Sequence, residues 1–210
     1  MIGPLLIIAA SSVIAASSGA AEPATLRPVR AAAALDCTYG SHALNDVKTF
    51  QHCARADSSG RPQVTRRHLR DLSYDRHGLS TIFIGGWYVI RRDGRLAPVM
   101  MMDNWAEDFS DGLARSPVGG KIGFVDRSLR LAIPARYDGA YPFNRGVAIV
   151  CIGCTSKTTG EYTSYVGGAW GCIDRFGRLK RPMRPLKPGG GIGENCPPSR
   201  PVRDRKSGAS

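Results

Sequence analysis

The residues with the clearest chemistry are six cysteines, an even number that suits three disulfide bridges. Cys37 and Cys53 flank a segment that we predict below to be a helix, and we expect them to pair. Cys151 and Cys154 have two residues between them, which favours a local bridge or a reactive pair. Cys172 and Cys196 complete the set.

The Cys151-x-x-Cys154 spacing also suits two functional alternatives. A thiol-disulfide enzyme of the thioredoxin type needs its first cysteine at a helix N-terminus, where the thiol pKa falls. Here a β-forming run, residues 147–150, precedes Cys151, so the sequence favours a structural bridge. A zinc site with Cys172 and Cys196 is the other alternative, but a zinc ribbon needs two close pairs of cysteines.

Acidic side chains give a weaker catalytic candidate. Glu107, Asp108 and Asp111 cluster in the sequence, and two carboxylates across a cleft can hydrolyse a glycoside. Because Asp111 precedes Gly112 at a predicted bend, a role in a turn is favoured instead.

A search for other catalytic motifs ends without a candidate. The chain has no G-x-S-x-G, no H-E-x-x-H and no Walker loop. His42 and His52 lie near Cys37 and Cys53 and could join them at a metal, but paired cysteines and exposed histidines are favoured. We therefore expect no catalytic residue, no metal site, no cofactor and no enzymatic activity.

The positive charge of the chain leaves two interpretations open. Lys and Arg number 29 against 17 Asp and Glu, a formal net charge of +12. A hydrophobic fraction of 42% excludes a wholly disordered chain. A solvated basic surface is the simplest interpretation, and attraction to an anionic envelope glycan, lipid or protein is the alternative. We expect no nucleic acid partner, because the N-terminus predicts export.

The N-terminus predicts a secretory signal peptide. An apolar run over residues 5–16 ends in small residues, and cleavage is expected after Ala20, with Ala21 the near alternative. A membrane anchor is disfavoured because the run falls short of the ~20 residues that span a bilayer. The expected organisation is a signal peptide (1–20), a tether (21–36), a small leader (37–79), a β domain (80–185) and a basic tail (186–210). The mature chain is then periplasmic or extracellular, with no transmembrane segment.

The leader is expected to contain one helix and one loop. Ser41 can cap a helix on which Leu44, Val47 and Phe50 share a face. Residues 54–80 carry many arginines and few apolar side chains, which indicates a basic loop.

The segment after position 80 repeats itself, which is typical of a stacked array. Gly123 and Gly171 lie inside predicted strands, where a glycine indicates that another backbone passes close by. Each unit reads as a small β-meander that cannot bury its own apolar face. The matching segments are 85–96 and 168–179, 119–134 and 167–182, and 108–114 and 142–148.

These segments resemble the WG-repeat family, named for a Trp-Gly pair in each unit. Residues 168–177 and 133–148 look like its two blocks, and the resemblance covers about residues 83–182. It implies a β-rich interaction module without a conserved catalytic centre. The residues that carry the resemblance, with structural roles, are Trp87, Gly94, Gly123, Asp126, Tyr137, Asp138, Phe143, Gly146, Trp170, Gly171, Asp174 and Gly177.

The departures from the pattern lead to further expectations. Tyr88 stands where the pair needs glycine, and Ile122 replaces the tryptophan of the middle unit. Leu129 replaces a turn glycine, and since a positive φ costs leucine about 1–3 kcal/mol, that turn is expected to take another form. Cys172 stands where the family usually has an aromatic residue, which favours a bridge to Cys196 in the tail.

The sequence as a whole predicts a mainly β protein, with about three antiparallel β-meander repeats after a small helical leader. The expected function is a non-enzymatic protein-interaction module of the bacterial envelope. Binding of an anionic envelope glycan or lipid is the first alternative. Thiol-disulfide exchange at Cys151 and Cys154 is the second.

Overall fold

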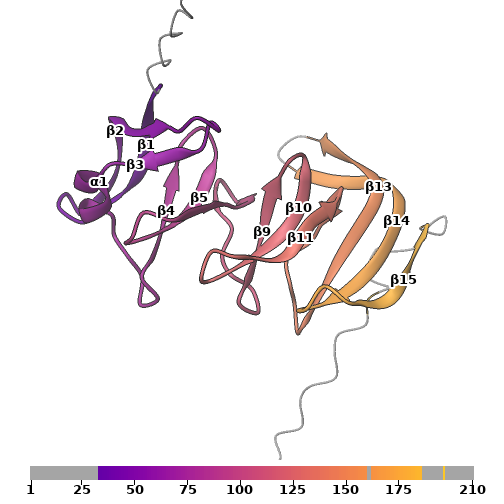
Figure 1. The fold of residues 1–210 in the computed structure, drawn as a ribbon. Coiled ribbons are helices and arrows are strands. Elements are labelled where there is room, and N and C mark those ends of the chain that lie inside the picture. Colours follow the sequence, from indigo (N-terminus) through magenta and orange to yellow (C-terminus); the bar gives the residue numbers. More distant parts are fainter. Residues whose placement is uncertain (1–32, 160–161, 186–195, 197–210) are drawn as a thin grey trace, which may run out of the picture. The chain divides into compact units, whose positions relative to one another are not determined.

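The computed structural model describes residues 33–159, 162–185 and Cys196 (Figure 1). The predicted signal peptide, most of the predicted tether and, except for Cys196, the predicted tail lie outside these residues. Within them, no helix has the length and apolar character needed to cross a membrane.

Antiparallel strands build nearly all of the described chain, as the sequence predicts. The first sheet has the strand order β3-β2-β1-β4-β5-β6, and two further sheets have the orders β11-β10-β9 and β12-β13-β14-β15. The elements are β1 (Ala34–Ser41), β2 (Asp46–Ala56), β3 (Pro62–Val64), α1 (Arg66–Asp71), β4 (Leu79–Phe83), β5 (Trp87–Arg91), β6 (Leu96–Pro98), β7 (Met101–Met102), β8 (Trp105–Ala106), β9 (Leu113–Val118), β10 (Lys121–Asp126), β11 (Leu131–Tyr137), β12 (Gly139–Ala140), β13 (Val147–Thr159), β14 (Tyr162–Asp174) and β15 (Leu179–Pro185).

The predicted β-meander is the building unit of these sheets. Three consecutive strands pair in turn in β4–β6, in β9–β11 and in β13–β15, which correspond to the three predicted repeats. The leader forms a fourth meander, β1–β3, and β1 pairs with β4. The first predicted repeat therefore shares one sheet with the leader.

The helix predicted after Ser41 is wrong, because this segment forms the β1–β2 hairpin. Leu44 and Val47, expected on an apolar helix face, are exposed. Burial instead alternates along β1, where Cys37 and Tyr39 enter the core. Pairing with β4 on the far side of β1 outweighs the weak helical period of the sequence.

The prediction that residues 54–80 form a basic loop is also wrong. This segment contains β3, the short helix α1 and the start of β4. Its six arginines are all exposed, on α1, at the end of β2 or between elements, which agrees with the low apolar content.

The core consists of three clusters of buried side chains. One lies in the leader and includes Tyr39, and a second includes Val89 of β5. The largest joins the second and third repeats and includes Phe124, Tyr137 and Trp170. Side chains of neighbouring meanders thus share clusters, as expected for units that cannot bury their own faces.

Candidate functional site

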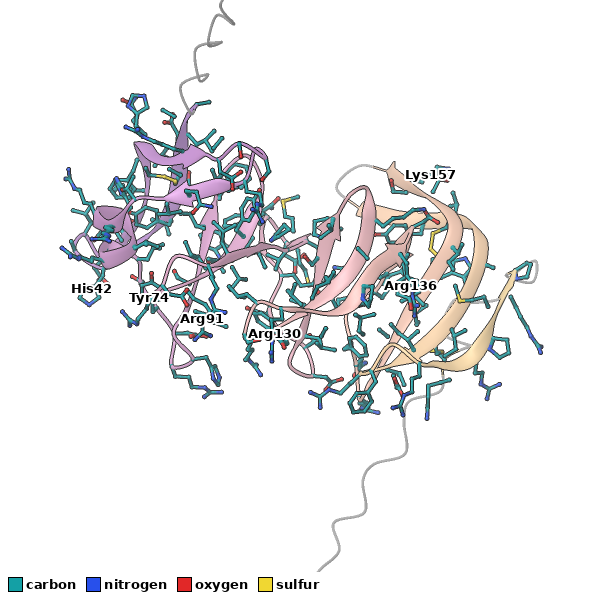
Figure 2. The ribbon with its side chains drawn as sticks, in the orientation of Figure 1. His42, Tyr74, Arg91, Arg130, Arg136 and Lys157 are labelled. Atoms are coloured by element: carbon teal, nitrogen blue, oxygen red, sulfur yellow. A yellow bond between two sulfur atoms is a disulfide. The ribbon has the colours of Figure 1, made fainter. Side chains whose placement is uncertain are left out.

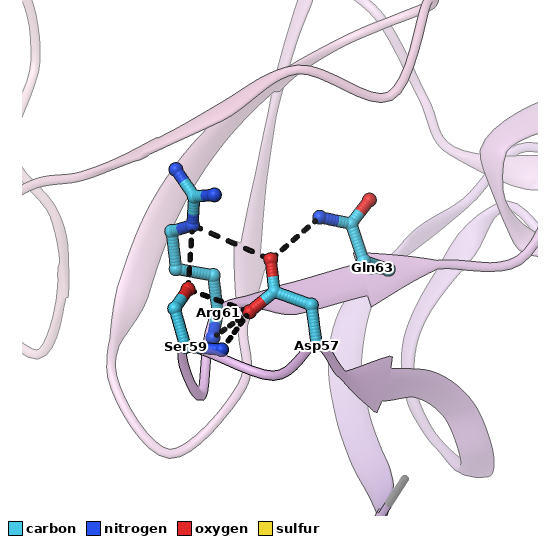
Figure 3. A network of polar contacts seen from close by, with 4 residues as sticks. All are labelled: Asp57, Ser59, Arg61 and Gln63. Atoms are coloured by element: carbon cyan, nitrogen blue, oxygen red, sulfur yellow. Dashed lines mark hydrogen bonds and ion pairs between the residues drawn. The ribbon is translucent and has the colours of Figure 1, made fainter.

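A tight turn with one organising carboxylate connects the second and third strands of the leader meander. The Asp57 Oδ1 atom accepts hydrogen bonds from the backbone N–H of Ser59 (2.9 Å) and of Arg61 (3.0 Å), and from the Ser59 hydroxyl (2.6 Å) (Figure 3). The Arg61 Nε atom lies 3.4 Å from Oδ2 and donates to Ser59 Oγ. Gly60 completes the turn at a φ of 80°.

The turn of the middle repeat has the same hydrogen bonds. Asp126 Oδ1 accepts from the N–H of Ser128 (2.8 Å) and of Arg130 (3.1 Å), and from the Ser128 hydroxyl (2.5 Å). Leu129 takes the glycine position at a φ of 60°. The expectation that this turn takes another form is therefore wrong. The Asp126 network closes the turn, and the Leu129 side chain packs against the core cluster under β5, which offsets the backbone strain.

The same backbone closure recurs in the outer repeats. The N–H of Gly177 donates to the Asp174 carbonyl and the N–H of Asp174 to the Arg178 carbonyl, both at 2.9 Å. Gly94 closes the β5–β6 turn in the same way onto Arg91. The sequence comparison missed the Asp57 turn, although the spacing D-x-S-x-R is shared by residues 57–61 and 126–130.

These hydrogen bonds lower the pKa of the turn carboxylates. Those from Ser59 and from the Arg61 backbone lower the pKa of Asp57 to about 2. Partial burial opposes the shift at Asp126, but the bonds from Ser128 and Arg130 still lower its pKa. Both carboxylates are therefore ionised at neutral pH.

Arginines from several turns come together at one edge of the repeats. The Arg175 and Arg127 guanidinium groups both reach Gly112. A Cβ atom added to this glycine would lie 3.3 Å from Arg175 Nη2 and 3.7 Å from Arg127 Nη1. Arg91 Nη1 donates to the carbonyl of Arg127 at 3.2 Å. These contacts bring Arg91, Arg127 and Arg175 together. We add the other arginines of the neighbouring repeat turns and call the set the arginine edge: Arg91, Arg127, Arg130, Arg145, Arg175 and Arg178, of which Arg91 and Arg130 are labelled in Figure 2.

Two-residue turns hold this edge in place. Asp111 and Gly112 both have positive φ, as do Arg145 and Gly146, a backbone conformation typical of tight β-hairpins. The Gly146 N–H donates to Asp111 Oδ2 at 2.7 Å and so ties one turn to the other. Asp111 thus has the turn role that the sequence favoured over catalysis.

Apolar side chains stand exposed among these arginines. Phe176, at the tip of the last turn, is 76% exposed, and the Arg178 guanidinium lies 5.2 Å above its ring. Leu131 and Leu179, which follow the second and third turns, are exposed too. The edge therefore offers cationic and apolar groups together, a combination that suits an acidic protein surface.

Most residues that carry the repeat pattern lie in the core, at turns or at contacts between neighbouring strands. Tyr137, Phe143 and Trp170 are buried in the largest core cluster. Asp138 contacts the Lys121 ammonium and accepts a hydrogen bond from the N–H of Gly153 at 2.8 Å. The glycines Gly94, Gly146 and Gly177 all have positive φ.

The two strand glycines differ in what they approach. A Cβ on Gly123 would lie 2.5 Å from the Ile133 carbonyl oxygen and 2.7 Å from the Ala135 nitrogen, so the expected close backbone is present. A Cβ on Gly171 would meet the Met183 sulfur at 2.5 Å, and the nearest backbone atom, the Arg181 carbonyl oxygen, at 3.1 Å. Trp87 departs from the buried tryptophan of the last unit, because it is only partly buried and its ring is tilted against that of Trp105.

The six cysteines form three pairs, and these are the pairs that the sequence favoured. The Cα atoms lie 5.9 Å apart in Cys37–Cys53, 6.1 Å in Cys151–Cys154 and 5.4 Å in Cys172–Cys196. Disulfides of this number are typical of an oxidising compartment.

The local pair is poorly placed for thiol chemistry. Cys151 is fully buried and Cys154 is 6% exposed, and both belong to strand β13. A reactive cysteine pair needs access and a helix N-terminus or a cation to lower its pKa. The described residues also contain no group of three or more His, Cys, Asp or Glu side chains suited to a metal ion.

Glu107, from the predicted acidic cluster, is buried in an ion pair. Its Oε2 atom lies 2.6 Å from Arg115 Nε, and Arg115 Nη1 donates to the Ala140 carbonyl at 2.8 Å. Burial raises the pKa of Glu107 above its ordinary value although Arg115 opposes the shift. This ion pair joins the segment after β8 to β9, and the hydrogen bond from Arg115 continues the link to β12.

Comparison with known proteins gives one match. The family model described as WG containing repeat matches residues 122–153, which run from β10 into β13. This segment is similar to that repeat and corresponds to the middle unit of the sequence pattern. No curated protein and no solved structure matches the chain.

Proposed function

We propose that this chain is an exported, non-enzymatic interaction protein whose arginine edge binds an acidic surface on a partner protein. The observation that carries the proposal is the convergence of Arg127 and Arg175 on Gly112, together with the exposed ring of Phe176 in the same turn as Arg175. Arginine and aromatic side chains supply most of the binding energy in many protein interfaces. The formal charge of +12 would further speed the encounter with an acidic partner.

The three cysteine pairs and the apolar N-terminal run support export. The turn arginines sit on rigid turns whose carboxylates accept several hydrogen bonds, as at Asp126. A rigid edge loses little conformational entropy on binding, which favours a specific contact.

An anionic envelope glycan or lipid is the alternative partner, and the same arginines favour it. Such a polymer would be held mainly by charge, so its retention should weaken steeply with salt. It would gain little from Phe176, Leu131 and Leu179. The exposed apolar side chains therefore favour a protein partner.

The test compares two charge-matched variants of the full exported chain. Arg175→Glu with Arg178→Glu removes two cations from the arginine edge. Arg55→Glu with Arg70→Glu makes the same change in net charge at exposed positions on β2 and α1. In a cross-linking pull-down from the envelope fraction, we expect the edge variant to lose a partner that the control variant retains.

A third variant separates the two kinds of partner. Phe176→Ala keeps every charge and removes the exposed ring. Loss of a defined protein with this variant supports the proposal. Retention of all bound material by Phe176→Ala, with release of that material by salt, identifies an anionic polymer instead. Equal binding by the edge variant and the control variant would refute both.

A further inference from the structure

Three aromatic rings stand in a row on the first repeat and on strand β8, which follows it. The Phe83 and Trp87 ring centroids lie 5.4 Å apart, and those of Trp87 and Trp105 lie 4.5 Å apart. Phe83 and Trp105 are each 40% exposed. We call these three residues the aromatic strip.

The aromatic strip lies at one end of a face of the β4–β5 hairpin, and the rest of this face packs against the next meander. On β4 and β5 the cross-strand pairs Thr81–Val89 and Phe83–Trp87 point to the same side. Val89 is buried in the core cluster that this face forms with the next meander. Trp87 packs against the edge of this cluster, Phe83 lies next to it and is exposed, and the Trp105 ring from β8 is tilted against that of Trp87.

A cavity of about 360 Å³ begins where the strip ends, at Trp105. Its apolar lining includes Trp105, Phe109, Val89 and Leu79. Hydroxyl and carboxylate groups line it as well, among them Ser73, Thr81, Asp75 and Asp108, and no lysine or arginine is among its lining residues.

We propose that this cavity and the aromatic strip bind a neutral saccharide. Aromatic faces pack against the C–H faces of a sugar ring, and a few convergent polar groups fix its orientation. Carboxylates and hydroxyls accept hydrogen bonds from sugar hydroxyls. The volume lies at the lower end of the range of small-molecule sites, ~300–1,000 Å³, which suits one or two sugar rings.

The charge of the lining decides which saccharide fits. Asp75, Asp108 and Glu107 all line the cavity, and Glu107 is held in its ion pair with Arg115. An anionic sugar would bring a like charge to these carboxylates without a lining cation to offset it. Arg127 of the arginine edge lies over the Phe109 ring, 5.5 Å from its centroid, but it is not among the residues that line the cavity. A neutral sugar meets no such penalty, so we expect it to be favoured over an anionic one.

The test uses the full chain with neutral tetrasaccharides of glucose and of N-acetylglucosamine. Tetragalacturonate and the deacetylated glucosamine tetramer serve as anionic and cationic probes. Binding is measured by tryptophan fluorescence and by calorimetry. We expect saturable binding of a neutral tetrasaccharide, and at least about a tenfold loss of affinity in Trp105→Ala, since a central aromatic contact is removed.

Phe176→Ala is the matched control, because it removes an exposed aromatic ring outside the cavity. The proposal requires this variant to bind the neutral saccharide as the wild-type chain does. It is overturned if none of the neutral probes binds, if only a charged probe binds, or if Trp105→Ala binds as well as Phe176→Ala. Circular dichroism checks that both variants fold.

Discussion

At the residue scale, a single carboxylate organises each of the two most similar turns. Asp57 and Asp126 each accept two backbone N–H bonds and one serine hydroxyl bond. These bonds replace water around the carboxylate and fix the turn before any partner binds. They also explain how Leu129 is held at positive φ, where glycine would be the usual choice.

The first prediction concerns the acidity of Asp57. The hydrogen bond from the Ser59 hydroxyl is the largest cause of its lowered pKa, about 2. Ser59→Ala should therefore raise the pKa of Asp57 toward the ordinary value of about 4. Ser58→Ala is the control, since the bonds to Asp57 come from Ser59, Arg61 and Gln63. Carboxyl-carbon NMR titration measures all three proteins.

The sign of the linked stability follows from the direction of this shift. Because the folded-state pKa of Asp57 lies below the unfolded value, its contribution is complete above about pH 4. It is lost as the pH falls toward 2. Titration of wild-type Asp57 near pH 4, or an equal shift in Ser58→Ala, would contradict the turn geometry.

At the element scale, the repeats were predictable and the leader was not. Trp170, Asp174 and Gly177 recur at fixed spacing, and repeated spacing identifies a strand–turn–strand unit without knowledge of its neighbours. The β1–β2 hairpin depends on pairing of β1 with β4, some 40 residues later, and local periodicity cannot show such a contact. The arginines of the repeat turns can be read from the sequence, but the approach of Arg127 and Arg175 to Gly112 could not be predicted, because these side chains meet only after the turns align.

The second prediction compares the two strand glycines. In Gly123→Ala the new methyl group would meet backbone atoms of β11, which cannot move without breaking the sheet. We expect the free energy of unfolding to fall by about 1–3 kcal/mol. In Gly171→Ala the nearest atom is the sulfur of Met183, a flexible side chain, so the loss should be smaller.

Urea denaturation of the two variants and the wild-type chain measures this difference. An equal loss in both variants would mean that the Arg181 carbonyl, 3.1 Å from the Gly171 position, constrains β14 as firmly as β11 constrains β10. That result would contradict the distinction drawn between the two strands.

At the scale of the whole molecule, two features concern contacts with other molecules: the exposed edge of strand β15, and the contrast between the basic arginine edge and the carboxylates that line the cavity. β15 pairs with β14 on one side, and among the described residues no strand covers its other side. Lys180, Arg181 and Arg184 along it discourage pairing with another chain. The arginine edge and the carboxylate-lined cavity then offer two surfaces of opposite character.

The disulfides contribute to overall stability mainly through the unfolded chain, in proportion to the logarithm of the loop that each one closes. Cys37–Cys53 spans 16 residues, whereas Cys151–Cys154 spans 3. Replacing both cysteines of the first pair by alanine should therefore cost about 1.5 kcal/mol more than the same change in the second pair. Urea denaturation of the two double variants measures the difference. A greater loss for the Cys151–Cys154 variant would show that this short bridge stabilises the folded strand β13 itself, and the account through the unfolded chain would fail for it.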